Sequence, residues 1–443
     1  MKNYCFHSTR RAFLASATAA LMAPSAASAF AAANDRIQIG VIGLGSRGFN
    51  LLDDFLKHRS ARIVALCDVD HLHYRDNAWG KGRAFGRKAA ADYVQKAYVK
   101  QGSPMSALFQ CNDYRELIDR KDVDAVVIAT PDHWHALCTL DALNAGKDVY
   151  CEKPVTHLFA EGQAVVQAVA RNKCVFQTGS QQRSDPLFRR VVELTRNGIP
   201  GDVQTIEVGL PPGYDKPQGD TTVQRPRADL DYEMWCGPSP VLPLMQARHH
   251  RWWRGHRAYG GGVLMDWIGH HNDIAHWAMG VDRAGPVTVE ATGWTFPETD
   301  VYNTPHEYTI RCAYANGVHS TISTHNRQGL KIIGTKGWVW VNRGRIEASD
   351  ATWLEPGFSP GAVKVTVSDD HVGNFLDCIR TRSECIAPAD AGHRSITPGH
   401  LAYVSNHLKR KLAWDPVAEV CPDDAEATEL LKATDYREPW RLA

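Results

Sequence analysis

Three features that would mark other classes of protein are missing from this sequence. Its eleven cysteines stand apart with no C-x-x-C pair, so neither a zinc ribbon nor a dense disulfide framework is indicated. Lys and Arg number 50 against 49 Asp and Glu, which leaves a formal charge of +1 and no sign of a nucleic-acid binder. No later segment approaches the roughly 20 apolar residues of a membrane-spanning helix. We expect no nucleic-acid partner and no stable membrane insertion.

The N-terminus has the pattern of an export signal. Arg10 and Arg11 precede an Ala-rich apolar run at residues 15–23, and Ala27-Ser28-Ala29 provides a small-residue cleavage site. Because the run is too short to span a membrane, we expect residues 1–33 to be a cleaved twin-arginine signal peptide. This predicts the twin-arginine export machinery as a partner and a periplasmic or otherwise exported mature protein.

A glycine-rich turn follows the first strand that the sequence predicts. Residues 37–42 form a β-branched run typical of a buried parallel strand, and a G-x-G-x-x-G pattern follows at once. Gly43 allows a tight turn, Gly45 lets the backbone approach a pyrophosphate, and Gly48 lets the next helix pack on the strand. The pattern at a strand-to-helix junction predicts a dinucleotide site that also includes Ser46 and Arg47.

A carboxylate ends the second predicted strand, at residues 62–67. Asp68 lies twenty residues after Gly48, where it would accept hydrogen bonds from the adenosine ribose and repel a 2′-phosphate. This favours NAD as the cofactor. Arg47 beside the turn could pair with a phosphate of either cofactor, so NADP stays possible.

Strands and helices alternate further along the chain. After a predicted helical insertion from His71 to Lys100, strands are expected at residues 124–129, 147–150 and 173–178. Ligands of an open parallel sheet bind at the carboxyl ends of its strands. The further cofactor-binding residues that we expect at those ends are Thr130, Pro131, His133, Trp134, His135, Glu152, Lys153 and Gln181.

These segments resemble one family. The A-T-P-x-H-x-H segment at residues 129–135, C-E-K-P at 151–154 and G-G-x-x-x-D-x-x-x-H at 261–270 are similar to those of the Gfo/Idh/MocA (glucose-fructose oxidoreductase / inositol dehydrogenase) family. The resemblance implies an α/β protein with a Rossmann NAD(P)-binding domain, residues 34–155. It also implies a C-terminal α/β domain, residues 156–443, with an open, mostly antiparallel sheet. The implied reaction is hydride transfer at a sugar or cyclitol hydroxyl.

The glycine turn at residue 260 is expected to open a helix that carries catalytic groups. Asp266, His270 and Asp273 are spaced four and three apart and would share one face. By resemblance, Lys153, Asp266 and His270 match the catalytic trio of the family. A histidine can take the hydroxyl proton near neutral pH, a lysine can stabilise the developing alkoxide, and Asp266 would fix the substrate or the histidine. Whether Lys153 or His270 is the principal base stays open.

Aromatic residues lie just upstream of this helix. Trp252 and Trp253 could stack on a pyranose ring, or could belong to the core, and with Asp273 they are the substrate-binding residues that we expect. A metal site formed by His270, His271 and His276 is an alternative. Because His271 points about 100° away from His270 on a helix, we expect no metal there.

The sequence predicts that the second domain contains a sheet with one apolar face open to a partner. Residues 201–209, 287–296, 308–315, 318–324 and 331–341 are β-rich, and Asn316-Gly317 is a hairpin signal. An open apolar sheet face favours association, so a homodimer or homotetramer is expected.

The expected export constrains the mechanism. An enzyme outside the cytoplasm has no free NAD pool, so a tightly bound cofactor must return to its starting oxidation state at each turnover. The enzyme would either oxidise one sugar and reduce another, or cleave a glycoside by transient oxidation and elimination. Ser46-Arg47 and Asp132–His135 resemble the NAD-dependent α-N-acetylgalactosaminidase branch, whereas Lys153 and the Asp266–His270 segment depart from it. Those departures favour the oxidoreductase, acting on a small carbohydrate or glycoside.

Overall fold

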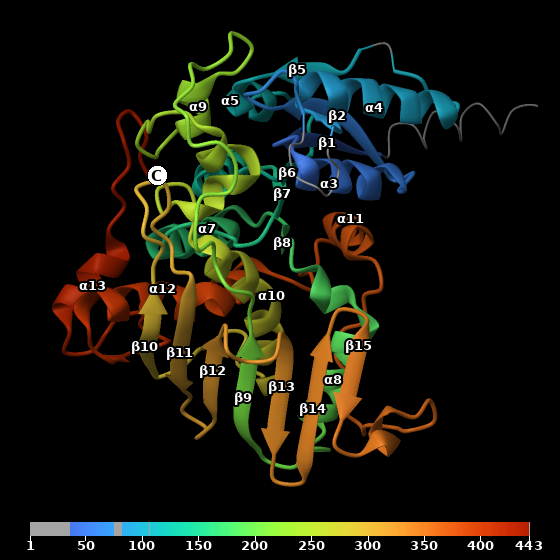
Figure 1. Ribbon diagram of the computed structural model, residues 1–443. Coiled ribbons are helices and arrows are strands. Elements are labelled where there is room, and N and C mark those ends of the chain that lie inside the picture. The colour runs from blue at the N-terminus through green and yellow to red at the C-terminus, as the bar shows by residue number, and fades with distance from the viewer. Residues whose placement is uncertain (1–35, 75–81, 106, 443) are drawn as a thin grey trace, which may run out of the picture.

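The computed structural model describes residues 36–74, 82–105 and 107–442. The expected signal peptide therefore lies outside the described residues. The chain forms two large sheets, with the parallel sheet above the eight-stranded sheet in the view of Figure 1. This is the predicted α/β fold.

The first domain is a six-stranded parallel sheet in the order β5-β2-β1-β6-β7-β8. Its strands are buried because helices cover both faces, which explains their continuous apolar runs. The sheet continues past residue 155 to β8, so its last strand follows helix α7. The strands are β1 (Ile37–Ile42), β2 (Ala61–Cys67), β5 (Phe109–Cys111), β6 (Ala125–Ile128), β7 (Asp148–Cys151) and β8 (Phe176–Thr178). The helices between them are α3 (Ser46–Leu56), α4 (Arg87–Lys100), α5 (Tyr114–Ile118), α6 (His135–Asn144) and α7 (Phe159–Asn172).

The predicted helical insertion is wrong in its first half. The two-residue strands β3 (His73–Tyr74) and β4 (Ala84–Phe85) pair antiparallel, and α4 begins only at Arg87. Gly86 stands before the helix with φ of 90°, a conformation that glycine adopts without steric cost. This turn separates the β3–β4 pair from the helix.

The second domain is an eight-stranded, mostly antiparallel sheet in the order β15-β14-β13-β9-β12-β11-β10-β16. The Asn316-Gly317 hairpin is confirmed, while the strand predicted at 331–341 is two strands joined by a tight turn at Thr335-Lys336. The strands are β9 (Val203–Gly209), β10 (Thr288–Thr295), β11 (Glu307–Ala313), β12 (His319–Ser323), β13 (Gly329–Gly334), β14 (Gly337–Asn342), β15 (Arg345–Ala348) and β16 (Leu412–Ala413).

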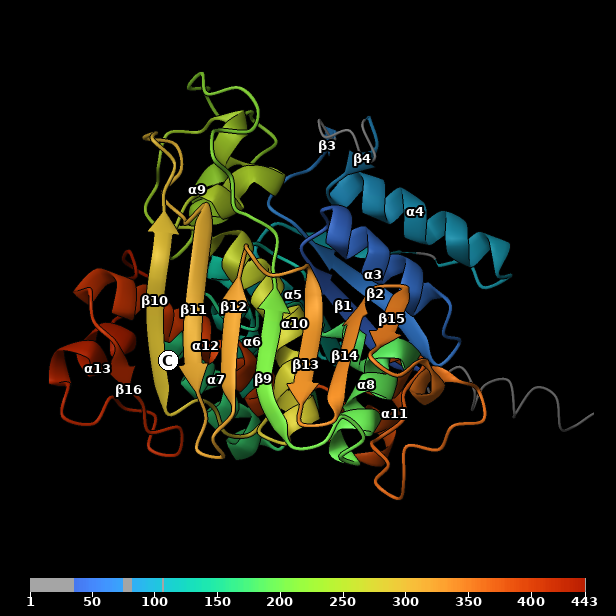
Figure 2. The same ribbon diagram turned by 60° about the horizontal axis from the view of Figure 1, so that its bottom comes forward.

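Helices pack on one face of this sheet. Figure 2 shows α8 (Pro186–Arg196), α10 (Gly262–Met279) and α12 (Ala389–Leu408) behind it, with its other face turned toward the viewer. Nearly all of α10 is buried between the sheet and the first domain, which brings its side chains to the strand ends of the Rossmann sheet. Within the described ranges, no helix has the length and apolar character needed to cross a membrane. The other α-helices of the described residues are α9 (Tyr232–Cys236), α11 (His371–Thr381) and α13 (Ala425–Lys432).

Candidate active site

A cavity of about 930 Å³ lies at the carboxyl ends of the parallel strands, and we call it the cleft. Its volume is at the upper end of the range for small-molecule sites. Both domains line it, as expected for a site at the strand ends. The sequence-predicted residues that line the cleft are Gly43, Gly45, Ser46, Arg47, Asp68, Thr130, Pro131, Trp134, His135, Glu152, Lys153, Gln181, Trp253, Asp266 and His270.

The glycine-rich turn has the shape that a dinucleotide requires. Gly43 has φ of 89°, and a Cβ atom there would lie 2.6 Å from the backbone of Ala129. A Cβ at Gly48 would lie 2.1 Å from the carbonyl oxygen of Gly43, so helix α3 can pack only with glycine there. At Gly45 a Cβ would meet no atom within 4 Å, which leaves the backbone open on the cleft side. These three positions fit an approaching pyrophosphate.

Asp68 fixes this turn and faces the cleft. Its Oδ2 accepts a hydrogen bond from the Leu44 backbone N–H at 2.6 Å, and its Oδ1 accepts one from Asp70 N–H at 2.8 Å. Burial raises the pKa of this carboxyl, while the two N–H donors act in the opposite direction. An ionised carboxylate has about four acceptor positions, so two bonds leave capacity for ribose hydroxyls.

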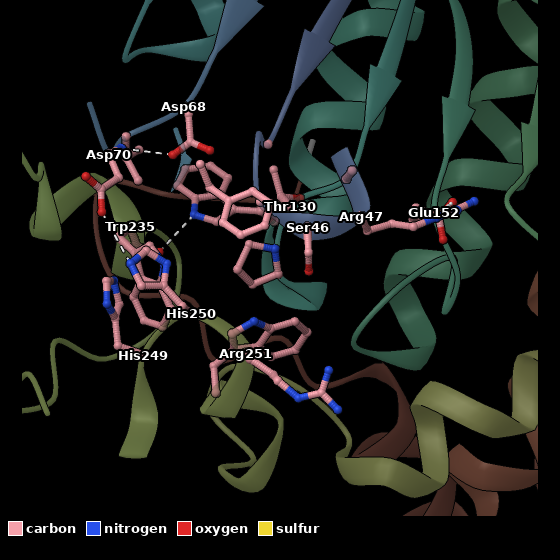
Figure 3. Close-up of a pocket in the computed structure, with 18 of the residues that line it drawn as sticks. Ser46, Arg47, Asp68, Asp70, Thr130, Glu152, Trp235, His249, His250 and Arg251 are labelled. Carbon is pink, nitrogen blue, oxygen red and sulfur yellow. Dashed lines mark hydrogen bonds and ion pairs between the residues drawn. The ribbon is translucent and has the colours of Figure 1, made fainter. Parts of the chain in front are cut away.

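Arg47 is held by a carboxylate rather than left free beside the turn. Its Nε lies 2.8 Å from Glu152 Oε1, and Gln181 Nε2 donates to the same oxygen at 3.1 Å. Burial alone lowers the pKa of the Arg47 guanidinium, but Glu152 holds that pKa above its ordinary value. Figure 3 shows Arg47 and Glu152 pointing toward one another. Arg47, Glu152 and Gln181 thus form one charged network along the cleft.

The predicted catalytic lysine and aspartate are in direct contact. Lys153 Nζ donates to Asp266 Oδ1 at 2.5 Å and to the Asp266 carbonyl at 3.0 Å, and Arg254 Nε lies 3.2 Å from the same carboxylate oxygen. Burial raises the pKa of the Asp266 carboxyl, but Arg254 and Lys153 outweigh burial and hold the pKa well below its ordinary value. Asp266 is therefore a fixed anion that aims two cations at the cleft.

His270 stands on the next turn of α10 and also lines the cleft. Burial and the charges of Lys153 and Arg343 lower the pKa of its imidazole well below the ordinary value. The side chain is therefore neutral at pH 7 and has one ring nitrogen able to accept a proton. Its Nδ1 is buried with no hydrogen-bond partner among the described residues.

Several predicted residues do not line the cleft. Asp273 lies seven residues, or about 10.5 Å of helix, beyond Asp266, where its carboxylate pairs with the buried Arg183 at 2.8 Å. Trp252 packs edge-on to Tyr214, while its neighbour Trp253 reaches the cleft. Gly48 lies beneath the turn, where it serves packing.

The two predicted histidines of the first domain hold segments in place. His133 is buried, and its ring nitrogens lie 3.1 and 3.0 Å from the carbonyl oxygens of Tyr259 and Trp235. His135 lines the cleft, and its Nδ1 lies 2.7 Å from the carbonyl oxygen of Pro154, next to Lys153. His135 thereby positions the backbone that carries the lysine.

The structure adds three residues that the sequence did not assign. Arg254 pairs with Asp266, Tyr214 also lines the cleft, and Arg343 reaches it from the β14–β15 turn. The guanidinium of Arg343 lies 5.0 Å from the ring centre of Trp267. In the sequence, the position of Arg254 directly after Trp252-Trp253 is the one feature that could have marked it as a site residue.

Residues 210–261, between β9 and α10, run up to the first domain, and we call them the crossing segment. The Asp231 N–H donates to the Val69 carbonyl, and the His71 N–H donates to the Asp229 carbonyl, both at 3.0 Å. Asn112, just before α5, donates a hydrogen bond from its Nδ2 to Asp231 Oδ2 of this segment at 3.1 Å. The crossing segment therefore closes the cleft near Asp68.

Comparison with known protein families identifies both halves of the chain. A model described as "Oxidoreductase family, NAD-binding Rossmann fold" matches residues 37–180, and one described as "Oxidoreductase family, C-terminal alpha/beta domain" matches residues 193–442. The chain belongs to the Gfo/Idh/MocA oxidoreductase family. The predicted family, fold, cofactor NAD and enzyme class are confirmed.

Solved structures share the fold over most of the chain. An aldose-aldose oxidoreductase from Caulobacter crescentus superposes with a TM-score of 0.59 at 20% identity, covering 85% of this chain and 99% of that one. A putative myo-inositol dehydrogenase from Sinorhizobium meliloti gives 0.56 at 19%, covering 85% and 99%. These identities establish a shared fold.

Curated relatives match a shorter stretch. An α-N-acetylgalactosaminidase from Shewanella oneidensis is 28% identical over 171 residues, 38% of this chain and 33% of the relative. A glycosyl hydrolase family 109 protein 2 from Shewanella sp. is 30% identical over 173 residues, 38% and 34% of the two chains. The match thus spans about a third of the length of these relatives.

Proposed function

We propose that this oxidoreductase transfers a hydride between NAD and a secondary hydroxyl of a sugar or cyclitol. The observation that carries the proposal is the meeting of Lys153, Asp266 and His270 in the cleft that the glycine-rich turn also lines. Two proteins of the same fold are named an aldose-aldose oxidoreductase and a putative myo-inositol dehydrogenase, which supports this substrate class.

The side chains divide the proton chemistry between them. When bound, NAD supplies the hydride acceptor. His270 is neutral and accepts the hydroxyl proton, while Lys153, held in place by Asp266, donates a hydrogen bond to the oxygen and stabilises its negative charge. Arg254 keeps Asp266 ionised and so keeps Lys153 in place. We propose His270 rather than Lys153 as the base, because Asp266 already engages Lys153 Nζ through its carboxylate and its carbonyl.

The cofactor is proposed to stay bound and to be recycled. The crossing segment bonds to the backbone next to Asp68, so it would enclose the adenosine end of NAD held by that carboxylate. Retention suits a protein that is exported already folded, as the twin-arginine pattern indicates. No described helix covers the other face of the eight-stranded sheet (Figure 2), and we propose that a second copy of the chain packs there in a homodimer or homotetramer.

A second candidate is a glycoside hydrolase that oxidises the sugar, eliminates the aglycone and reduces the sugar again. The curated relatives named α-N-acetylgalactosaminidase and glycosyl hydrolase family 109 favour it. Lys153 and the Asp266–His270 segment depart from the α-N-acetylgalactosaminidase branch, and this favours the oxidoreductase.

Deuterium tracing separates the two candidates. Purified protein is mixed with sugars and cyclitols labelled at each carbinol carbon, together with unlabelled aldoses and N-acetylgalactosaminides. The proposal expects the label to move to the second sugar. Lys153→Ala should abolish this transfer, whereas Lys96→Ala, a change at an exposed lysine, should leave it intact. Glycosidic cleavage with solvent exchange at C2 would assign the hydrolase, and no transfer from any of these substrates would overturn the proposal.

A further inference from the structure

Three metal-ligating side chains converge beside Asp68. Asp70 follows β2, His73 stands in β3, and His250 belongs to the crossing segment. His73 Nδ1 lies 3.4 Å and His250 Nε2 lies 3.3 Å from one atom, Oδ2 of Asp70. All three ligand atoms lie within 4.8 Å of one another. Figure 3 shows His250 and Asp70 pointing toward each other.

Hydrogen bonds within the described chain do not account for this arrangement. Asp70 Oδ1 accepts bonds from Arg227 at 2.6 Å and from the Leu72 N–H at 3.2 Å. Oδ2 of Asp70 has the two imidazole nitrogens near it, but neither contact has the geometry of a hydrogen bond, and Nδ1 of His73 is likewise buried without a hydrogen-bond partner among the described residues. The two residues are 1% and 8% exposed, so water does not readily replace the missing partner. Buried polar atoms of this kind are costly unless something binds them.

The chemistry of the three atoms selects the ligand. Two imidazole nitrogens and one carboxylate oxygen form a common zinc donor set, with bonds of about 2.0–2.2 Å. Tetrahedral bonds of that length separate neighbouring ligand atoms by about 3.3–3.6 Å, and the two separations from Asp70 Oδ2 are 3.4 Å to His73 and 3.3 Å to His250. We propose that Asp70, His73 and His250 bind a divalent transition-metal ion of the zinc class.

The surroundings suit such an ion. Arg227 and the Leu72 N–H hold one carboxylate oxygen, so the other is presented as a single ligand, in the manner of outer-shell partners. The rings of His73 and His250 are stacked, 3.7 Å apart with 14° between their planes. A metal ion lies in the plane of each imidazole that it binds, so an ion held by both would require the two rings to turn out of this stack. Three protein ligands leave a fourth position for water.

The position of the site indicates what the metal does. Asp70 and His73 belong to the Rossmann domain, whereas His250 comes from the crossing segment. One ion would thus join the two parts at the end of the cleft next to Asp68. His250 has φ of 46°, an uncommon conformation for a residue other than glycine, and it directs the ring toward Asp70.

Metal titration of the full chain tests the proposal without reference to catalysis. Protein stripped with a chelator is titrated with Co²⁺ and then Zn²⁺, and bound metal is counted by mass spectrometry. We expect about one ion per chain, the visible absorption of tetrahedral Co²⁺, and its loss when Zn²⁺ displaces it. His250→Ala and His73→Ala should weaken binding at least 100-fold, a loss no smaller than that for outer-shell partners.

His71→Ala is the matched control, because His71 is exposed and stands two residues before His73. It should bind like wild type, and Zn²⁺ should raise the melting temperature of both but not of His250→Ala. Absence of uptake by folded wild-type protein would overturn the proposal, whatever the variants do. Equal affinity of wild type and folded His250→Ala, judged by circular dichroism, would also overturn it.

Discussion

Replacing Asp68 by Asn tests how the cleft chooses its cofactor. The Asp68 carboxylate already accepts two backbone N–H bonds, from Leu44 and Asp70. An amide of the same shape keeps one acceptor oxygen but loses the charge. The substitution therefore weakens the glycine-rich turn, which lowers the affinity for NAD and NADP alike. Loss of the ribose hydrogen bond lowers the affinity for NAD only.

The size of the difference follows from that contact. A hydrogen bond to a charged group is worth about 1.5–3 kcal/mol, which corresponds to about 10–100-fold in affinity. Calorimetric titration of stripped Asp68→Asn should show NAD weakened by that factor, and NADP weakened less because its repulsion is relieved. Asp92→Asn, an exposed carboxylate of α4, is the control. Equal weakening of NAD and NADP would refute the role of Asp68 as ribose ligand.

Three further changes have expected outcomes. Lys153→Ala and His270→Ala should each keep bound NAD but slow single-turnover nicotinamide reduction by about 10²–10⁴-fold, and wild-type rates in both would remove the proposed site. Gly48→Ala should lower the free energy of unfolding by about 1–3 kcal/mol and weaken NAD binding, because the added Cβ would collide with the Gly43 carbonyl. An unchanged melting temperature would contradict the packing argument. Burial lowers the pKa of several histidines from 6.5 to about 4, so on acidification the unfolded chain binds protons at a higher pH than the folded chain does. The melting temperature should therefore fall as the pH drops from 6.5 to 4. A melting temperature that does not change over this range would contradict the argument. Those histidines are His133, His135, His276 and His371.

The parts of the site that depend on local spacing could be predicted. Gly43 and Gly45 are recognisable because a strand, a turn and a helix follow each other directly. The parallel strands are recognisable as continuous apolar segments. Asp266 and His270 are one helical turn apart, and the structure places both at the cleft. For such residues the neighbouring sequence determines the position.

Other parts depend on contacts between distant segments. Asp273 has the helical phase of Asp266, but the buried Arg183, ninety residues earlier, pairs with it outside the cleft. Arg254 and Tyr214 belong to the crossing segment, whose course is set by backbone bonds to residues near β2. No periodicity marks such a segment, and for the same reason the meeting of His250 with Asp70 could not be predicted.

Mass spectrometry of the nucleotide released from denatured protein tests the central claim most directly. Purified enzyme is first mixed with a substrate sugar deuterated at the reacting carbon, and then denatured. The account predicts close to one NAD(H) per chain, with one deuterium on the reduced nicotinamide, and loss of that deuterium after a second, oxidised sugar is added. Protein that releases no nucleotide, or NAD(H) that stays unlabelled with every sugar, would contradict it.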